Sequence, residues 1–215
     1  MHQDEAFPYG ATGWSPEDPK QIIITRVPAN SRVLDIGCGN GLLGEWLKQN
    51  KNCSVVGVEG HPKGFRQAQT RLDQVLQVDL NDTQTLKRSL QRLERFDVIT
   101  GIDVLEHCYQ PQAILKIMAD RINPSGQLIV SIPNVAHHSV RFGLLRGRWE
   151  YQDTGILDRT HVAFYTKQTA MELVQKGGFR IKEVLHTSPQ GGYWRLIDRI
   201  DPGLTAVQFI IIAQR

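Results

Sequence analysis

The chain has 215 residues, of which 40% are hydrophobic and 22% are charged, and these fractions are ordinary for one globular domain. Its 25 basic and 22 acidic side chains leave a net charge of only +3, and the modest basic stretch at 141–148 falls short of the patch that nucleic-acid-binding proteins carry. The three cysteines, Cys38, Cys53 and Cys108, form no Cys-x-x-Cys pair, which argues against a zinc site or a disulfide framework.

The N-terminal residues, "MHQDEAFPYG", are acidic and lack the apolar stretch of a secretory signal. The longest apolar runs, at 22–24 and 209–213, are far too short to span a membrane. These features predict a cytoplasmic protein with no membrane span. Residues 1–30 are expected to form a lead-in arm with a short helix near 19–26, ahead of one main domain at 31–215.

From residue 31 onward, short apolar strands alternate with segments of helical periodicity. Strands are expected at 32–36, 54–58, 75–78, 96–102, 126–132, 180–186 and 206–213. Helices are expected at 41–49, 62–72, 82–93, 111–122 and 166–178, with Asp82 and Thr166 as N-caps and Gly177 and Gly178 as a stop. This alternation predicts an α/β, doubly wound fold with a parallel sheet covered on both faces.

Two segments, at 133–165 and 187–204, interrupt the alternation. The first leaves its strand at the carboxyl end, where the ligands of parallel sheets bind. Segments of this length inside a compact domain usually serve a function, so both are expected on the substrate side.

A glycine-rich turn follows the first predicted strand. Asp35 precedes Gly37, Gly39 and Gly41 in a D-x-G-x-G-x-G pattern, and the missing Cβ atoms would let a ligand lie against the backbone. Residues 39–44 can also be read as the G-x-G-x-x-G of dinucleotide-binding proteins, which keeps NAD open as a less favoured ligand.

Acidic residues follow four successive predicted strands: Asp35, Glu59, Asp79 and Asp103. Glu59 lies about 20 residues beyond the glycines, where a ribose-binding acid belongs. Asp79 is placed to accept the amino group of an adenine, with Leu80 against its ring. One such acid is often only a helix cap, but all four together fit a ligand with a ribose, an adenine and an ammonium-bearing end, such as S-adenosylmethionine.

These stretches resemble the motifs of class I S-adenosylmethionine-dependent methyltransferases: "VLDIGCGNG" their first motif, "GVEG" their second, "VDL" their adenine-binding turn and "FDVITGIDVLEH" their fourth-strand motif. The resemblance covers residues 33–180. It implies a Rossmann-like sheet of seven strands, mostly parallel, with an antiparallel last strand, and a methyltransferase domain at 31–215. It also implies cofactor contacts from Asp35, Gly37, Cys38, Gly39, Glu59, Gly60, Asp79, Leu80 and Asp103.

The residues after the fourth strand restrict the acceptor. They lack the Asn/Asp-Pro-Pro-aromatic motif of adenine- and amide-N-methylating enzymes and the Pro-Cys of cytosine-C5 enzymes. "DVLEH", "SIPNVAH", "GRWEY" and "GILDRTHVAFYT" resemble a bacterial subgroup that methylates saccharides and small metabolites and is close to the ubiquinone O-methyltransferases. The resemblance implies a small-molecule acceptor and favours a hydroxyl oxygen, with nitrogen and carbon left open, and the modest basic stretch predicts no nucleic-acid partner.

The enzymatic role and the oligomeric state are among the points that the sequence leaves open. A similar sequence pattern occurs in a methyltransferase-like protein of methionine biosynthesis that acts as the partner of an acyltransferase. A binding partner with no turnover of its own is therefore the alternative function. The oligomeric state is left open, a homodimer included.

A hydroxyl acceptor also needs a base to take its proton. His161, at the end of the first interruption, is the first candidate, and His107, after the fourth strand, is the second. His137 and His138 rank lower. The aromatic residues of the two interruptions either wall an acceptor pocket or anchor their loops; they are Trp149, Tyr151, Phe164, Tyr193 and Trp194.

Asp103-x-x-Glu106-His107 is similar to the metal motif of small-RNA 2′-O-methyltransferases, Glu-x-x-Glu-His-His, and some ubiquinone enzymes also bind magnesium. Here the first acid is Asp, and Cys108 stands in place of the second histidine. Because the ligand set is incomplete, we expect no catalytic metal. Cys108 is expected to be a small core residue rather than a nucleophile.

Overall fold

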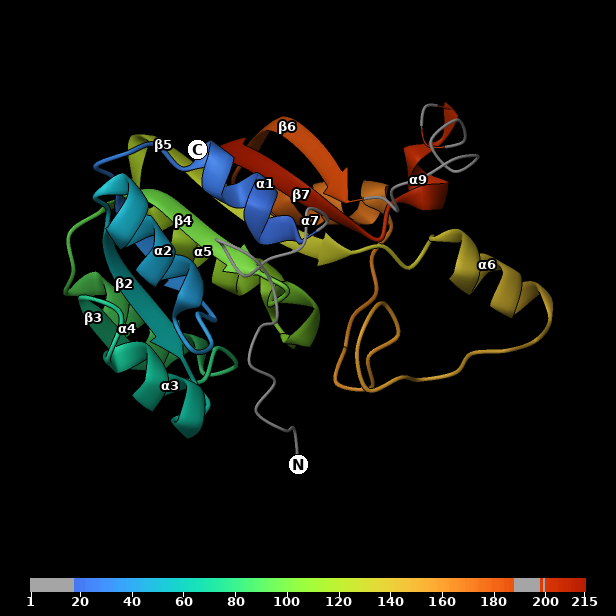
Figure 1. The fold of residues 1–215 in the computed structure, drawn as a ribbon, viewed down its shortest axis with the longest axis horizontal. Coiled ribbons are helices and arrows are strands. Elements are labelled where there is room, and N and C mark those ends of the chain that lie inside the picture. Colours follow the sequence, from blue (N-terminus) through green and yellow to red (C-terminus); the bar gives the residue numbers. More distant parts are fainter. Residues whose placement is uncertain (1–17, 188–197, 199) are drawn as a thin grey trace.

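The computed structural model describes residues 18–187, 198 and 200–215. Within these residues seven strands form one sheet in the order β3-β2-β1-β4-β5-β7-β6 (Figure 1). The strands are β1 (Arg32–Ile36), β2 (Ser54–Glu59), β3 (Gln74–Gln77), β4 (Phe96–Ile102), β5 (Ile122–Pro133), β6 (Arg180–Thr187) and β7 (Gln208–Gln214). Neighbours among β1 to β5 pair in parallel, whereas β7 pairs antiparallel with both β5 and β6. The predicted fold class, including its antiparallel last strand, is confirmed.

The predicted helices are also present, with small differences at their ends. They are α1 (Pro19–Arg26), α2 (Leu42–Lys51), α3 (Pro62–Gln69), α4 (Thr83–Gln91), α5 (Pro111–Arg121) and α7 (Lys167–Lys176). Asp82 and Thr166 cap α4 and α7 as expected, and Thr166 forms a capping box with Thr169. Ile122, expected to end a helix, begins β5 because it pairs with Phe96 of β4.

Short helices also lie where the sequence showed no helical periodicity, and those whose bounds fall within the described part of the chain follow. They are the 3₁₀ helix η1 (Leu105–His107), α6 (His138–Leu145) and α9 (Pro202–Thr205). In α6 only Val140 is buried, while Phe142, Leu144 and Leu145 are exposed, so the helix has no apolar stripe facing a core.

Helices cover both faces of the sheet because its inner strands alternate their apolar side chains between two cores. On one face, α1, α2 and α3 pack with Val33 and Val55; Figure 1 shows these helices in front of the sheet. On the other face, α4, α5 and α7 pack with Leu34 and Val56. The successive β1 residues Val33 and Leu34 therefore belong to different cores.

The described part of the predicted lead-in arm is α1, which is firmly packed. Ile23 is fully buried in the core, and Arg26 forms an ion pair with Glu183 of β6 at 3.0 Å. Residues 1–17 lie outside the described part of the chain, as do residues 188–197 and 199 of the second predicted interruption. Across the described ranges, no helix is both long and apolar enough to cross a membrane.

The first interruption forms α6 and a long loop that project beyond the end of β5 (Figure 1). Its two ends meet, because Asn134 and Tyr165 form an isolated parallel bridge and Val135 N–H donates to the Tyr165 carbonyl at 2.9 Å. The segment is therefore closed at its base and lies beside the carboxyl ends of the parallel strands.

Candidate functional site

The turn that follows β1 contains three glycines with left-handed backbone angles. Gly37, Gly39 and Gly41 have φ angles of +68°, +56° and +81°, which favour glycine. A Cβ atom on Gly37 would lie 2.5 Å from Val104 Cγ2, whereas one on Gly39 would meet no atom within 4 Å. Gly39 therefore leaves open space above the turn, where a ligand can approach the backbone.

Asp35, at the tip of β1, is buried and bonded within the sheet. Its Oδ1 accepts a hydrogen bond from Thr100 Oγ1 of β4 at 2.7 Å, and only 4% of the residue is exposed. Burial raises the pKa of Asp35 to about 6. A carboxylate held in this way favours a nearby positive charge.

Glu59, at the tip of β2, connects the ends of two strands. Its Oε2 accepts from Gly39 N–H at 2.8 Å, and its Oε1 accepts from His61 N–H at 2.7 Å. Each carboxylate oxygen keeps a second lone pair, so Glu59 can accept two further hydrogen bonds from a diol.

A cleft of about 380 Å³, the glycine cleft, opens above these residues. Six residues predicted to bind the cofactor line it: Asp35, Gly37, Cys38, Gly39, Glu59 and Asp103. The other three, Gly60, Asp79 and Leu80, are not among its lining residues. Asp79 is exposed after β3 and accepts from Asn81 N–H at 2.9 Å, and Leu80 is half-buried against the core.

The structure adds Lys20 of α1 to the glycine cleft, which also includes Asn40 and His61. Lys20 lowers the pKa of both Asp35 and Asp103 by Coulombic attraction, against the larger raising effect of burial. The sequence held no local signal for Lys20, because its place in the cleft depends on how α1 packs across the sheet.

Asp103 separates the glycine cleft from a second cavity and lines both. Its φ is +52°, unusual for a residue other than glycine, and its Oδ1 accepts from Ser131 Oγ of β5 at 2.6 Å. Surrounding protein atoms desolvate the carboxyl and raise the pKa of Asp103, although the residue is accessible from the cavities.

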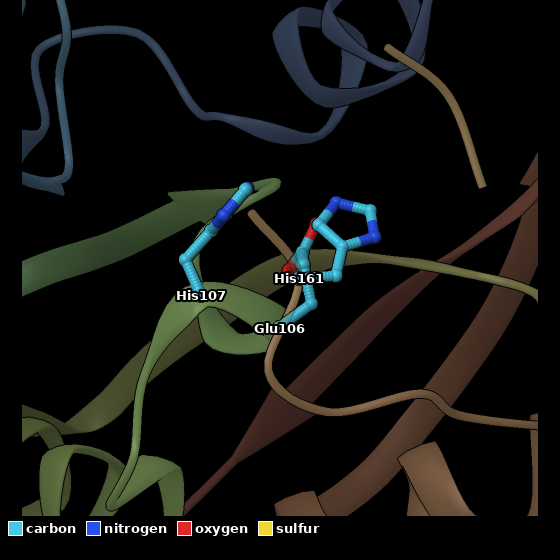
Figure 2. A group of neighbouring side chains, drawn as sticks. All are labelled: Glu106, His107 and His161. Atoms are coloured by element: carbon cyan, nitrogen blue, oxygen red, sulfur yellow. The ribbon is translucent and has the colours of Figure 1, made fainter. Parts of the chain in front are cut away.

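The second cavity, of about 250 Å³, contains both predicted base candidates and is called the histidine cavity. The rings of His107 and His161 lie edge to face with centroids 4.7 Å apart (Figure 2). His161 Nδ1 lies 3.1 Å from the Ile156 carbonyl oxygen, and His107 Nδ1 lies 3.3 Å from that of Thr160. If each Nδ1 donates to its carbonyl, each Nε2 keeps a lone pair.

Burial lowers the pKa of His161, of which 9% is exposed, so its imidazole is neutral near pH 7. His137 and His138 line neither the glycine cleft nor the histidine cavity. His137 instead caps α6, and His138 Nδ1 lies 3.2 Å from the Leu204 carbonyl oxygen.

Backbone hydrogen bonds bring the two histidines together. The Glu106 carbonyl accepts from Val162 N–H at 2.9 Å and from Ala163 N–H at 3.1 Å. These bonds fix the end of the long loop against η1, beside the sequence neighbour His107. Any residue type can form these backbone bonds, so the sequence could not predict them.

The Glu106 side chain is the most unusual group of the site. Only 1% of the residue is exposed, and neither carboxyl oxygen has a hydrogen-bond partner among the described residues. Burial and the nearby Asp103 raise the pKa of Glu106 well above its ordinary value. Its burial without a partner favours the protonated form of the carboxyl, and a positive charge placed beside it would favour the carboxylate.

Glu106, His107 and His161 together offer ligand atoms that all lie within 4.8 Å of one another (Figure 2). One carboxylate and two imidazoles fit Zn²⁺ or another divalent transition metal. Cys108 occupies the position of the second histidine in the sequence motif. It is buried, and its Sγ lies 3.2 Å from the Val104 carbonyl oxygen. His161, 54 positions along the chain from His107, supplies the third donor instead.

Three aromatic residues of the first interruption form a cluster beside His161. Phe164 has its ring centroid 5.2 Å from Trp149 and 6.1 Å from His161, and Tyr151 lies 6.4 Å from Phe164. Tyr193 and Trp194 lie outside the described residues.

Comparison with known proteins identifies the family of this chain. A methyltransferase domain family model matches residues 16–184. Ubiquinone biosynthesis O-methyltransferase of Cereibacter sphaeroides is 29% identical over 173 residues, which are 78% of this chain and 68% of that protein. Its namesake in Azorhizobium caulinodans is 30% identical over 172 residues, 77% of this chain and 66% of that protein. The chain thus spans about two thirds of the length of these relatives.

Solved structures show the same fold. A SAM-dependent methyltransferase from Archaeoglobus fulgidus superposes with a TM-score of 0.65 at 17% identity, covering 93% of this chain and 92% of that one. Magnesium protoporphyrin IX methyltransferase from Synechocystis, with bound SAH, superposes with a TM-score of 0.63 at 18% identity. The superposition covers 93% of this chain and 83% of that one.

The buried carboxyl of Asp35 predicts a pH-dependent cost to stability. The unfolded carboxyl ionises near its ordinary pKa of 3.8, whereas the folded one ionises only near 6, so folding becomes less favourable as pH rises between these values. Asp35→Asn keeps an acceptor for Thr100 without the charge. It should raise the free energy of unfolding at pH 7.5 by about 1–3 kcal/mol.

Urea denaturation at pH 4 and pH 7.5 measures this effect. The difference between variant and wild type should nearly vanish at pH 4, where Asp35 is largely protonated when folded. Asp153→Asn, which removes an exposed partner of Arg159, is the control and should change stability little at either pH. A destabilised Asp35→Asn protein at pH 7.5 would contradict the prediction.

Proposed function

The chain belongs to the S-adenosylmethionine-dependent methyltransferases, and we propose that it transfers the methyl group to a hydroxyl oxygen of a small-molecule acceptor. S-adenosylmethionine is the methyl donor of this family. The observation that carries the proposal is the shared wall at Asp103. The glycine cleft and the histidine cavity meet there, so a donor in the first would present its methyl group to an acceptor in the second.

In this proposal each part of the cofactor has its own partners in and around the glycine cleft. The carboxylate of Glu59 accepts the ribose hydroxyls, and the open backbone at Gly39 receives the methionine end. Asp35 and Asp103 attract the ammonium group, whereas Lys20 attracts the carboxylate at the same end. Asp79 and Leu80, together with Gly60 beside them, lie outside the cleft lining and would bind the adenine as it extends past the tip of β3.

Methyl transfer is an in-line displacement at the sulfonium carbon. The acceptor oxygen forms a bond to the methyl carbon while the carbon–sulfur bond breaks, and the electron pair stays on sulfur as a neutral thioether. The acceptor proton passes to Nε2 of His161, which is neutral near pH 7 and later releases the proton to water. Because the cofactor is already reactive, the main task of the protein is to position the acceptor.

Glu106, His107 and His161 would also hold a divalent cation, which would acidify an acceptor hydroxyl beside it. We nevertheless propose a metal-free reaction. Asp103, the first acid of the sequence motif, is bonded to Ser131 and does not belong to the group of three possible ligands, so the ligand set of the motif stays incomplete.

The cofactor preference of the glycine cleft can be measured directly. Calorimetry should detect binding of S-adenosylhomocysteine and no binding of NAD. Glu59→Ala should weaken the binding of S-adenosylhomocysteine by about 1.5–3 kcal/mol, because a charged hydrogen-bond acceptor is lost. Glu94→Ala, an exposed carboxylate outside the cleft lining, is the control and should bind normally. Heat with NAD and none with S-adenosylhomocysteine would contradict the proposed cofactor site.

Substitution tests the proposed base. With pooled metabolite extracts as acceptors, His161→Ala should form S-adenosylhomocysteine roughly 10²–10⁴-fold more slowly than wild type. Its affinity for S-adenosylhomocysteine should barely change, because the glycine cleft is intact. His138→Ala, outside both cavities, is the control. Near-normal turnover in His161→Ala would contradict His161 as the base and favour His107 in that role. If the wild type showed no turnover in any pool, the protein would instead be a binding partner without catalysis.

Chelation distinguishes a role of His161 as a free base from a role as a metal ligand. Turnover should survive dialysis against a strong chelator, because the proposed base is a free imidazole. The control is the same assay with Mg²⁺ or Mn²⁺ returned after dialysis. Loss of activity that either ion restores would make Glu106, His107 and His161 metal ligands.

A further inference from the structure

A third cavity, of about 420 Å³, lies within the first interruption and has no part in the proposed mechanism. One wall is α6, with Val140 and Phe142, and the other is the loop at 146–157. We call it the arginine cup after Arg146 and Arg148, which line it and belong to the basic stretch of the sequence at 141–148.

The arginine cup adjoins the histidine cavity at one residue. Ile156 lines both, and its carbonyl oxygen is the one that lies 3.1 Å from His161 Nδ1. The residue that orients the proposed base is therefore also the boundary between the two cavities. An acceptor with its hydroxyl at His161 would extend past Ile156 into the cup.

The charges of the cup are largely uncompensated. Arg146 Nη1 donates to the Phe142 carbonyl at 3.1 Å, whereas the Arg148 guanidinium forms no hydrogen bond or ion pair with the rest of the described chain. Glu150 lines the cup as well, yet it forms no ion pair with either arginine. Two guanidinium groups against one carboxylate leave the cup positive, and an unpaired guanidinium matches phosphate or carboxylate oxygens.

We infer that the arginine cup binds an anionic group of the acceptor, a phosphate or a carboxylate, while the reacting hydroxyl lies at His161. This inference rests on the proposed function and narrows its substrate class. Arg148 and Arg146 hold the anion, and the apolar side chains of Val140, Phe142 and Ile156 contact the part of the acceptor that joins its two ends.

Direct anion binding tests the cup without any methyl transfer. The full chain, saturated with S-adenosylhomocysteine, is titrated calorimetrically at low salt with inorganic pyrophosphate and, separately, with succinate. We expect millimolar binding of at least one anion that weakens as salt is added. Preference for pyrophosphate assigns the cup to phosphate, and preference for succinate assigns it to carboxylate. No binding of either anion overturns the inference.

Three variants localise the binding to the cup. Arg148→Gln should weaken anion binding at least about fivefold, whereas Glu150→Gln should strengthen it, because removing the carboxylate makes the cup more positive. Arg159→Gln is the matched control: it removes an arginine of the same loop that pairs with Asp153 and does not line the cup, and it should bind the anion as wild type does. Equal weakening by Arg148→Gln and Arg159→Gln overturns the inference.

Turnover separates this inference from the proposed function. A metabolite extract is split by anion exchange into neutral and anionic fractions, and the formation of S-adenosylhomocysteine is measured for each. We expect acceptors in the anionic fraction, with kcat/KM reduced at least about tenfold in Arg148→Gln, kcat retained, and partial rescue in Arg148→Lys. Acceptors only in the neutral fraction overturn the anion subsite and leave the proposed function standing. Anion binding that depends on Arg148, with no turnover in any fraction, supports the cup and contradicts the proposed function.

Discussion

Parallel pairing of β1 with both β2 and β4 is the constraint on which the site depends. It brings the ends of three strands to one edge of the sheet, so Asp35, Glu59 and Asp103 gather around one cleft although the chain separates them widely. The register is specified by burial, because a shift of one residue would move Leu34 and Ile36 to the opposite face. The packing that stabilises the sheet thus also fixes the spacing of the carboxylates.

Much of this architecture could be predicted from the sequence, because it is encoded locally. Short apolar runs predicted the strands, Thr166 and Asp82 predicted helix starts, and the glycines after Asp35 predicted a tight turn. Lys20 could not be predicted in the cleft, since its position depends on distant packing of Ile23. The same holds for the contact of His161 with His107, and α6 was missed because most of its apolar side chains face no core.

The donor and acceptor sides of the molecule have different structural origins. The glycine cleft is made of strand tips and tight turns within the sheet, whereas the histidine cavity and the arginine cup depend on one long loop and on α6. Asp103 joins the two sides, and its bond to Ser131 holds it in a backbone conformation that few residues other than glycine adopt. Changes within the loop can therefore alter the acceptor while the donor side stays intact.

The position of β7 has a consequence for the order in which the protein is assembled during synthesis. β7 lies between β5 and β6, so β6 leaves the ribosome with no strand to pair with until residues near 214 emerge. Val207 and Gln208, which line the histidine cavity, arrive with the same strand. A nascent chain that has completed β1 to β5 already holds Asp35, Glu59 and Asp103, whereas the α1 helix that carries Lys20 completes its packing only when β7 arrives.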